Sequence, residues 1–219
     1  MKKTHISEKL VIALILALIG GMIDAYTYIF RGQVFAFAQT GNMIKLAMGI
    51  TDLNAQEIFR YSLPIIAFVI GIVISCSLRD KYKDNKRVHW RQIVLVIEML
   101  ILIVVSMIPL GNMNFIANIF VSLICAMQYE AFKKFEGNPF SSLFCTGNLR
   151  SFSEQFYQAI TRKEKVNLKK CSRYLIIISV FMLGVIIGDI LTQRLLQYAC
   201  LLPIILLLSA ALLMRKEKI

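Results

Sequence analysis

Two Thr-Gly-Asn triplets, each downstream of an acidic residue, are the features of this sequence with the most evident chemical potential. Thr40-Gly41-Asn42 follows Asp24, and Thr146-Gly147-Asn148 follows Glu130 at the same spacing. A glycine allows a sharp turn, and a threonine hydroxyl or asparagine amide can cap a following helix. The free N–H groups of such a helix start attract an anion or a carboxylate. We therefore interpret both triplets as candidate substrate-binding segments; the alternative is a capped loop between helices.

Asp24 lies in an apolar stretch, toward the end of the first long hydrophobic segment. A charged side chain at the centre of a membrane helix costs about 2.5 to 3.5 kcal/mol on insertion scales. Tyr28 and Arg31 share its helical face at i+4 and i+7, so a contact between Asp24 and either of them is available. Such a contact would make Asp24 a structural tie. The functional alternative is a proton or substrate site facing a cavity.

Three other acids are embedded among apolar residues. Glu130 lies one turn before Lys133 and Lys134, and this spacing favours a local ion pair at the membrane boundary. Glu98 and Asp189 are surrounded by aliphatic residues and are further candidate proton carriers. Asp24 and Glu130 take precedence because they occupy matching positions relative to the two triplets.

The segments that must position these residues are strongly hydrophobic. The chain has 219 residues, 58% of them hydrophobic, and a mean hydropathy of +0.67, whereas soluble domains are about half apolar. About 20 apolar residues cross a bilayer as a helix. The sequence therefore predicts an all-α, polytopic membrane protein with six transmembrane helices, near residues 9–30, 58–78, 92–110, 114–133, 173–193 and 196–214.

The two halves of the chain resemble each other. A shift of 106 positions superimposes Asp24 on Glu130 and the first triplet on the second. Three helices per half place the second half in the opposite orientation, so we expect two inverted three-helix repeats, 9–110 and 114–214, within one membrane domain spanning 1–219. Gly71 with Ser75, and Gly184 with Gly188, have the spacing at which two helix backbones approach closely.

A short helix is expected after each triplet. Residues 43–50 are apolar but too few to span, so this segment should be re-entrant or interfacial. Residues 149–160 have apolar side chains at helical spacing with charged residues opposite, which indicates an amphipathic helix near the inner surface.

The distribution of the 25 basic residues predicts the orientation. With both termini inside, all but Arg31, Lys45, Arg60 and Arg194 lie in inner segments, as the positive-inside rule requires. The same distribution explains the net charge of +12 without nucleic acid as a partner.

Several classes of function lack the residues they need. His5 and His89 are the only histidines, both in polar segments, and the five cysteines form no CxxC pair. No nucleotide-binding, hydrolase or zinc-protease motif occurs. We therefore expect no metal, no cofactor, no structural disulfide and no enzymatic activity.

The segment from Gly20 to Tyr28, followed by Gly32 to Phe35 and Ala38 to Asn42, resembles the signature of the YoaK-like family of small bacterial inner-membrane proteins. A second signature, Met127-Gln128 with Cys145 to Leu149, resembles that family as well. The resemblance implies a bacterial cytoplasmic-membrane protein of six or seven helices without an established substrate. Gln39 and Gln128, polar residues of these signatures, join the candidate substrate-binding residues, which also include Asp24, Tyr28 and Glu130.

The leading hypothesis is a secondary transporter of a small anionic or zwitterionic solute. The two triplets would meet near the bilayer midplane, and Asp24 would bind a coupling proton. The alternative is a non-transporting scaffold that binds anionic lipid or protein partners through its basic inner face and its small-residue helix faces. The lipid bilayer is a partner in either case, and a homo-oligomer is compatible with both.

Overall fold

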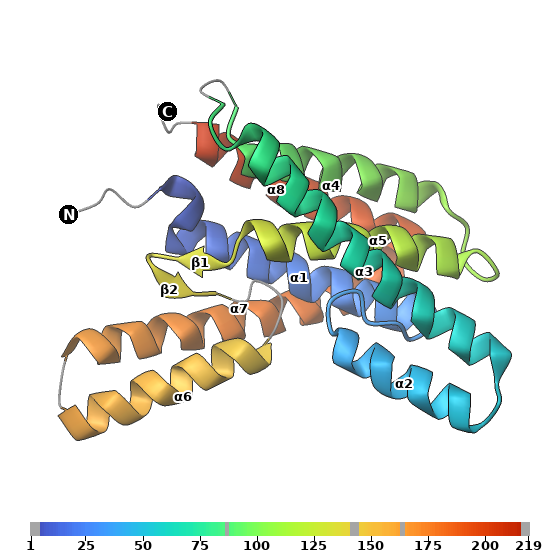
Figure 1. Ribbon diagram of the computed structural model, residues 1–219, viewed down its shortest axis with the longest axis horizontal. Coiled ribbons are helices and arrows are strands. Elements are labelled where there is room, and N and C mark those ends of the chain that lie inside the picture. Colours follow the sequence, from blue (N-terminus) through green and yellow to red (C-terminus); the bar gives the residue numbers. More distant parts are fainter. Residues whose placement is uncertain (1–4, 86–87, 141–144, 163–164, 216–219) are drawn as a thin grey trace.

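The computed structural model describes residues 5–85, 88–140, 145–162 and 165–215, and these residues form a bundle of helices (Figure 1). The elements, in chain order, are η1 (Ile6–Glu8), α1 (Leu10–Phe30), α2 (Gln39–Thr51), α3 (Ala55–Tyr82), α4 (Trp90–Met107), α5 (Asn114–Ala131), β1 (Lys134–Phe135), β2 (Asn138–Pro139), α6 (Cys145–Arg162), α7 (Lys165–Leu195), η2 (Leu196–Leu201) and α8 (Leu202–Arg215). The strands β1 and β2 form a short antiparallel hairpin.

Each of the six predicted apolar segments contains a helix. Four stretches of the described chain are long and apolar enough to cross a membrane: α1, α3, α4, and residues Asn167–Arg215, which include α7 and α8. The 18-residue α5 falls outside this set because polar residues, among them Asn118, Gln128 and Glu130, interrupt it. These helices are consistent with a polytopic membrane protein. The largest differences from the predicted boundaries are that α7 begins eight residues before position 173 and that η2 precedes α8.

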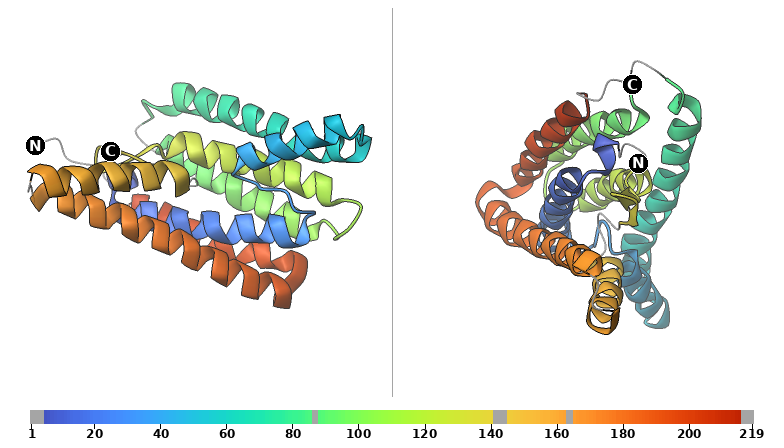
Figure 2. Two further views of the ribbon diagram at one scale, coloured as in Figure 1. Left: turned by 90° about the horizontal axis from the view of Figure 1, so that it is seen from below. Right: turned by 90° about the vertical axis from the view of Figure 1, so that its left-hand side faces the viewer.

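The packing between helices follows one pattern in both halves of the chain. α1 packs along α7 and α3 along α5, while α2 lies on α3 and α6 on α7. In the same way α4 contacts α5 and α8 contacts α1, and α4 and α8 also meet each other. These contacts map onto one another when α1, α2, α3 and α4 are exchanged for α5, α6, α7 and α8, while α3 also contacts α4 and α7 contacts η2. Figure 2 shows α1 and α5 surrounded by the other long helices.

Small residues bring two parallel helix pairs into close contact. A Cβ atom on Gly184 of α7 would lie 2.2 Å from the Leu18 carbonyl oxygen of α1, and one on Gly188 would lie 2.7 Å from the Cα atom of Met22. A Cβ atom on Gly71 of α3 would lie 2.3 Å from the Leu123 carbonyl oxygen of α5. Both predicted small-residue faces are thus packing surfaces within the chain. The expectation that they bind partner proteins is wrong, because they are already covered.

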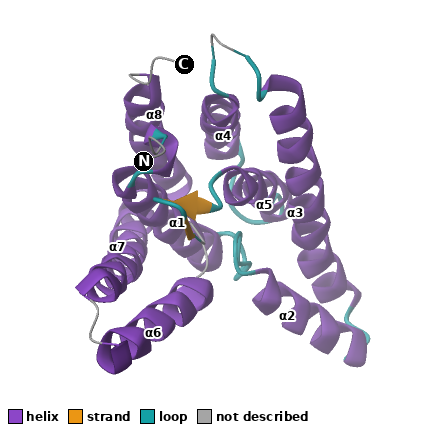
Figure 3. Ribbon diagram, turned by 60° about the vertical axis from the view of Figure 1, so that its left-hand side comes forward, coloured by secondary structure: helices purple, strands orange, loops and turns teal. Residues whose placement is uncertain are grey.

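α2 and α6 begin in the middle of the molecule and run toward opposite ends (Figures 1 and 2). Figure 3 shows the same arrangement from another side, with the first turns of the two helices pointing toward each other. Each first turn contains a Thr-Gly-Asn triplet, since α2 starts at Gln39 and α6 at Cys145. The two short helices predicted after the triplets therefore exist, but the triplets lie inside them and not in the preceding breaks.

Candidate functional site

The segment between α1 and α2 folds back along α1. The Phe37 amide donates a hydrogen bond of 3.1 Å to Oδ1 of Asp24, which lies six residues before the end of α1. At 1.5 Å per residue, the chain has returned about 9 Å along the helix axis when α2 begins. Gly32 and Gln33, with φ values of 89° and 58°, make the turn. The predicted turn at Gly41 is wrong, because that residue is helical.

Asn42 holds this returning segment in place. Its side-chain oxygen accepts from the Phe35 amide at 3.1 Å, and its side-chain nitrogen donates to the Phe35 carbonyl at 2.7 Å. The same nitrogen donates to Gln39 Oε1, and Gln39 in turn donates to the Ala36 carbonyl. Both side chains are buried. Asn42 therefore fixes the backbone that precedes α2; the predicted capping role is wrong, because α2 has no side-chain cap.

Gly41 allows the Phe35 ring to pack closely against the start of α2. A Cβ atom there would lie 2.9 Å from the Phe35 ring, and that ring stacks on Tyr28 at 4.7 Å between centroids. Tyr28 itself is 42% exposed. The contact of Asp24 with Tyr28 or Arg31 that the helical spacing allows does not form. Tyr28 stacks on Phe35, Arg31 binds Tyr26, and the Phe37 amide donates to Asp24.

Arg31 is completely buried and ties α1 to α4 and α5. Its Nε donates to the Tyr26 hydroxyl at 2.8 Å. Its two terminal nitrogens donate to the Val105, Ile108 and Pro109 carbonyls and to Asn114 Oδ1. A cation at the last carbonyls of α4 also interacts favourably with that helix's dipole. Its position after α1 identified Arg31 only as a loop cation, and no sequence signal indicated its burial.

The second triplet reproduces the burial of the first. Thr40 and Thr146 are exposed, Gly41 and Gly147 are half-buried, and the two asparagines are buried, with Asn148 4% exposed. Asp24 is close enough to the Cys145 thiol, at the start of α6, to interact with it electrostatically. The structure therefore brings both triplets and Asp24 toward one region. Residues 141–144, which precede α6, lie outside the described chain.

Glu130 belongs to a separate cluster. Its carboxylate lies 2.5 Å from Lys133 Nζ and 3.1 Å from an Arg79 nitrogen of α3, and Cys76 Sγ lies at 3.4 Å. The local ion pair with Lys133 is confirmed, and Arg79 is a partner that the sequence did not indicate. Glu130 is thus not a second copy of the Asp24 site, although the two acids occupy equivalent positions in the chain.

Gln128 faces the interior beside Glu98 of α4. Its terminal amide lies 2.6 and 3.1 Å from the two carboxyl oxygens of Glu98, and both side chains are at most 1% exposed. Cys125, one turn earlier on α5, interacts electrostatically with both Glu98 and Asp24. Gln128 therefore lies against a carboxyl group on a different helix.

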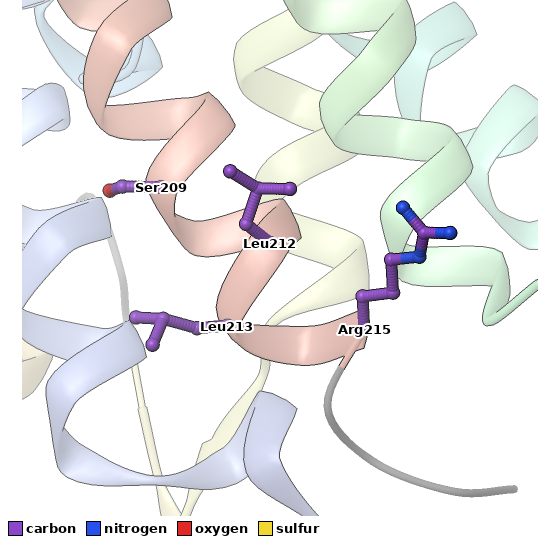
Figure 4. Close-up of a pocket in the computed structure, with 4 residues that line it drawn as sticks. All are labelled: Ser209, Leu212, Leu213 and Arg215. Atoms are coloured by element: carbon purple, nitrogen blue, oxygen red, sulfur yellow. The ribbon is translucent and has the colours of Figure 1, made fainter.

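A hollow elsewhere on the bundle contains none of the predicted residues. Ser209, Leu212, Leu213 and Arg215 line it near the end of α8 (Figure 4). Its lining is mostly aliphatic and comes from one helix. It therefore offers no convergent polar groups for a solute.

Comparison with known proteins places the chain in a family. The family described as "Protein of unknown function (DUF1275)" matches residues 12–213. The chain belongs to this family. The "UPF0700 transmembrane protein YoaK" of Bacillus subtilis (strain 168) is 24% identical over 201 residues, which cover 88% of each chain. The resemblance to the YoaK-like family is thereby confirmed, and this DUF1275 protein is a transmembrane protein. No solved structure matches it.

Proposed function

We propose that this DUF1275 protein is a secondary transporter of a small anionic or zwitterionic solute, which binds between the first turns of α2 and α6. The observation that carries the proposal is that these two turns, with their Thr-Gly-Asn triplets, point toward each other in the middle of the bundle (Figure 3). Discontinuous helices whose N-terminal ends point at an anionic group occur in the substrate sites of known transporter folds.

The helices of the first half pack in the same way as those of the second half, and this similarity supports an inverted repeat. Because α1 and α7 run parallel, as do α3 and α5, two units of three spanning helices would be related by an axis in the membrane plane. Rocking of one unit against the other would expose the region between α2 and α6 alternately to the two sides.

Asp24 and the two asparagines would define the solute region. Asp24 orients the segment before α2 through the Phe37 amide, and its negative charge lies close to the start of α6. A zwitterionic solute fits such a region best, because helix N-termini attract a carboxylate while Asp24 attracts an ammonium group. We therefore place the solute's two charges between these groups.

The proposal also covers the membrane that contains the protein and the side on which its termini lie. We infer a bacterial cytoplasmic membrane with both termini on the inner side, because the basic residues gather there. η1 and α8 pack at the same end of the bundle, in keeping with an even number of crossings. We propose no enzymatic activity and no nucleic-acid partner.

Proteoliposomes that enclose a pH-sensitive dye test the proposal. Sets of small anionic and zwitterionic solutes are added outside, and solute-dependent changes in internal pH are recorded for the native protein, Asp24→Asn, Asn42→Ala and Asn148→Ala. We expect at least one set to move protons with the native protein and the three variants to lose this response. Gln56→Ala, on the exposed start of α3, is the matched control. Native-like responses from Asp24→Asn and Asn42→Ala, or no response to any set, would overturn the proposal.

A further inference from the structure

The polar residues of α5 follow one face of the helix through the interior of the bundle. Asn118, Ser122, Cys125 and Gln128 recur at intervals of three or four residues, and all are at most 1% exposed. At 1.5 Å per residue they extend over about 15 Å. This face begins beside Arg31, whose carbonyl accepts from Asn118 Nδ2 at 2.7 Å, and it ends at Glu98.

The repeat itself does not require this polarity. The positions 106 residues earlier, on α1, are Ile12, Leu16, Ile19 and Met22, and these apolar side chains pack in the core. An apolar face at the equivalent place is therefore sufficient for the scaffold. A buried polar side chain costs free energy unless it is hydrogen-bonded, so the polar face of α5 needs an explanation other than packing.

Two atoms on this face have no hydrogen-bond partner among the described residues: Asn118 Oδ1 and Ser122 Oγ. Buried polar atoms without a protein partner are typically satisfied by ordered water. The intervals between successive polar side chains, about 4 to 6 Å along the axis, are of a length that one or two water molecules bridge.

Glu98 lies at the end of this face, and no basic side chain of the described residues forms an ion pair with it. The Gln128 amide is its neighbour on α5, and the Cys125 thiol interacts with it electrostatically. The basic groups near the ends of α4 and α5 are engaged elsewhere, Arg91 with Glu8 and Lys133 with Glu130. On η2, Cys200 directs its thiol to the Gln197 and Leu102 carbonyls. An unpaired carboxylate in such surroundings is costly, whereas a neutral carboxyl avoids that cost and still accepts the hydrogen bond that the Gln128 amide nitrogen donates.

We propose that Glu98 binds and releases a proton inside the bundle, through water held along the polar face of α5. In this exchange a water molecule that has received a proton from its neighbour passes one to a carboxylate oxygen of Glu98, while the Gln128 amide nitrogen keeps donating to the carboxyl group; release reverses the step. The inference rests on the proposed transport function and deepens it, because Glu98 replaces Asp24 as the coupling-proton site. Asp24 keeps its role as the acceptor that orients the segment before α2.

Infrared spectroscopy of the full-length protein in lipid nanodiscs tests this inference without a solute. The carbonyl stretch of protonated carboxyl groups is recorded at neutral pH for the native protein, Glu98→Gln and Asp24→Asn. We expect a protonated-carboxyl band that Glu98→Gln abolishes and Asp24→Asn retains. Gln128→Leu should shift the band, because the carboxyl group loses the hydrogen bond that the Gln128 amide donates to it.

Transfer to heavy water distinguishes a proton site from a static buried acid. We expect the Glu98 band to shift through deuteration in the native protein, and to shift more slowly in Ser122→Val. Circular dichroism and thermal unfolding identify any variant that fails to fold. A spectrum that Glu98→Gln leaves unchanged, or a Glu98 band that heavy water never shifts, would overturn the inference. Because no solute enters this experiment, its failure is separate from a failure of the transport assay.

Discussion

The Asp24 carboxylate accepts a hydrogen bond of 3.1 Å from the Phe37 amide, and this bond joins the acid of α1 to the segment that starts α2. It explains why α2 begins in the middle of the bundle, since the chain must return along α1 to reach Asp24. The region proposed for the solute depends on that return.

Replacing Asn42 should loosen the segment before α2. Asn42→Ala removes three hydrogen bonds, to Phe35 N, Phe35 O and Gln39. Leaving buried backbone groups unpaired costs about 1 to 3 kcal/mol. Hydrogen exchange measured by mass spectrometry should therefore show faster exchange over residues 33–37. Thr51→Ala, on the exposed end of the same helix, should leave that peptide unchanged.

Replacing Arg31 should destabilise the whole bundle. Arg31→Lys keeps the charge but cannot reproduce a planar group that donates to carbonyls, Tyr26 and Asn114 together. Several buried, charge-assisted hydrogen bonds are lost, so we expect a cost of about 3 kcal/mol. The melting temperature in detergent should fall clearly below that of Arg150→Lys, whose side chain is 80% exposed in the native protein. Equal melting temperatures would contradict the proposal that Arg31 stabilises the bundle through its hydrogen bonds to the last carbonyls of α4.

Adding side-chain volume at Gly184 should separate α1 from α7. The Cβ atom of Gly184→Val would lie 2.2 Å from the Leu18 carbonyl oxygen, a backbone atom that cannot move alone. Overpacking costs about 1 to 3 kcal/mol, and the tightness of this contact places Gly184→Val at the upper end. Ala47→Val, on the exposed face of α2, adds volume without such a neighbour. Thermal unfolding should distinguish the two variants, and equal stability would argue against the close helix contact.

The ion pairs of Glu130 should stabilise the structure without serving transport. A double-mutant cycle of Glu130→Gln with Lys133→Gln should give a favourable coupling that decreases as salt is added, because Lys133 is half exposed. Glu130→Gln should still move protons in the proteoliposome assay. A variant that unfolds normally but has lost that response would contradict the structural role of Glu130.

Hydropathy predicted the helices well because bilayer thickness fixes the length of an apolar segment. The two short helices were also predicted, but the Thr-Gly-Asn triplets were wrongly placed before them instead of in their first turns. The sequence could not show that Gly41 is helical. A glycine is required there because the Phe35 ring lies against it, and that contact exists only once the chain has folded back. The burial of Arg31 could not be predicted either, since its hydrogen-bond partners lie on or next to α4 and α5, far away in the sequence. By contrast, the polar spacing of Asn118, Ser122, Cys125 and Gln128 was readable against the apolar residues of α1.

The access of water to the two triplets decides whether they line a solute region. Thr40→Cys and Thr146→Cys are made separately in a protein whose five native cysteines are replaced, and membrane vesicles are treated with a charged, membrane-impermeant maleimide. Val69→Cys, on the exposed apolar face of α3, is the control for a position facing lipid. The proposed solute region predicts that water reaches both triplets, so both variants should be labelled while Val69→Cys stays unlabelled. Protection of both triplets to the level of Val69→Cys would contradict it.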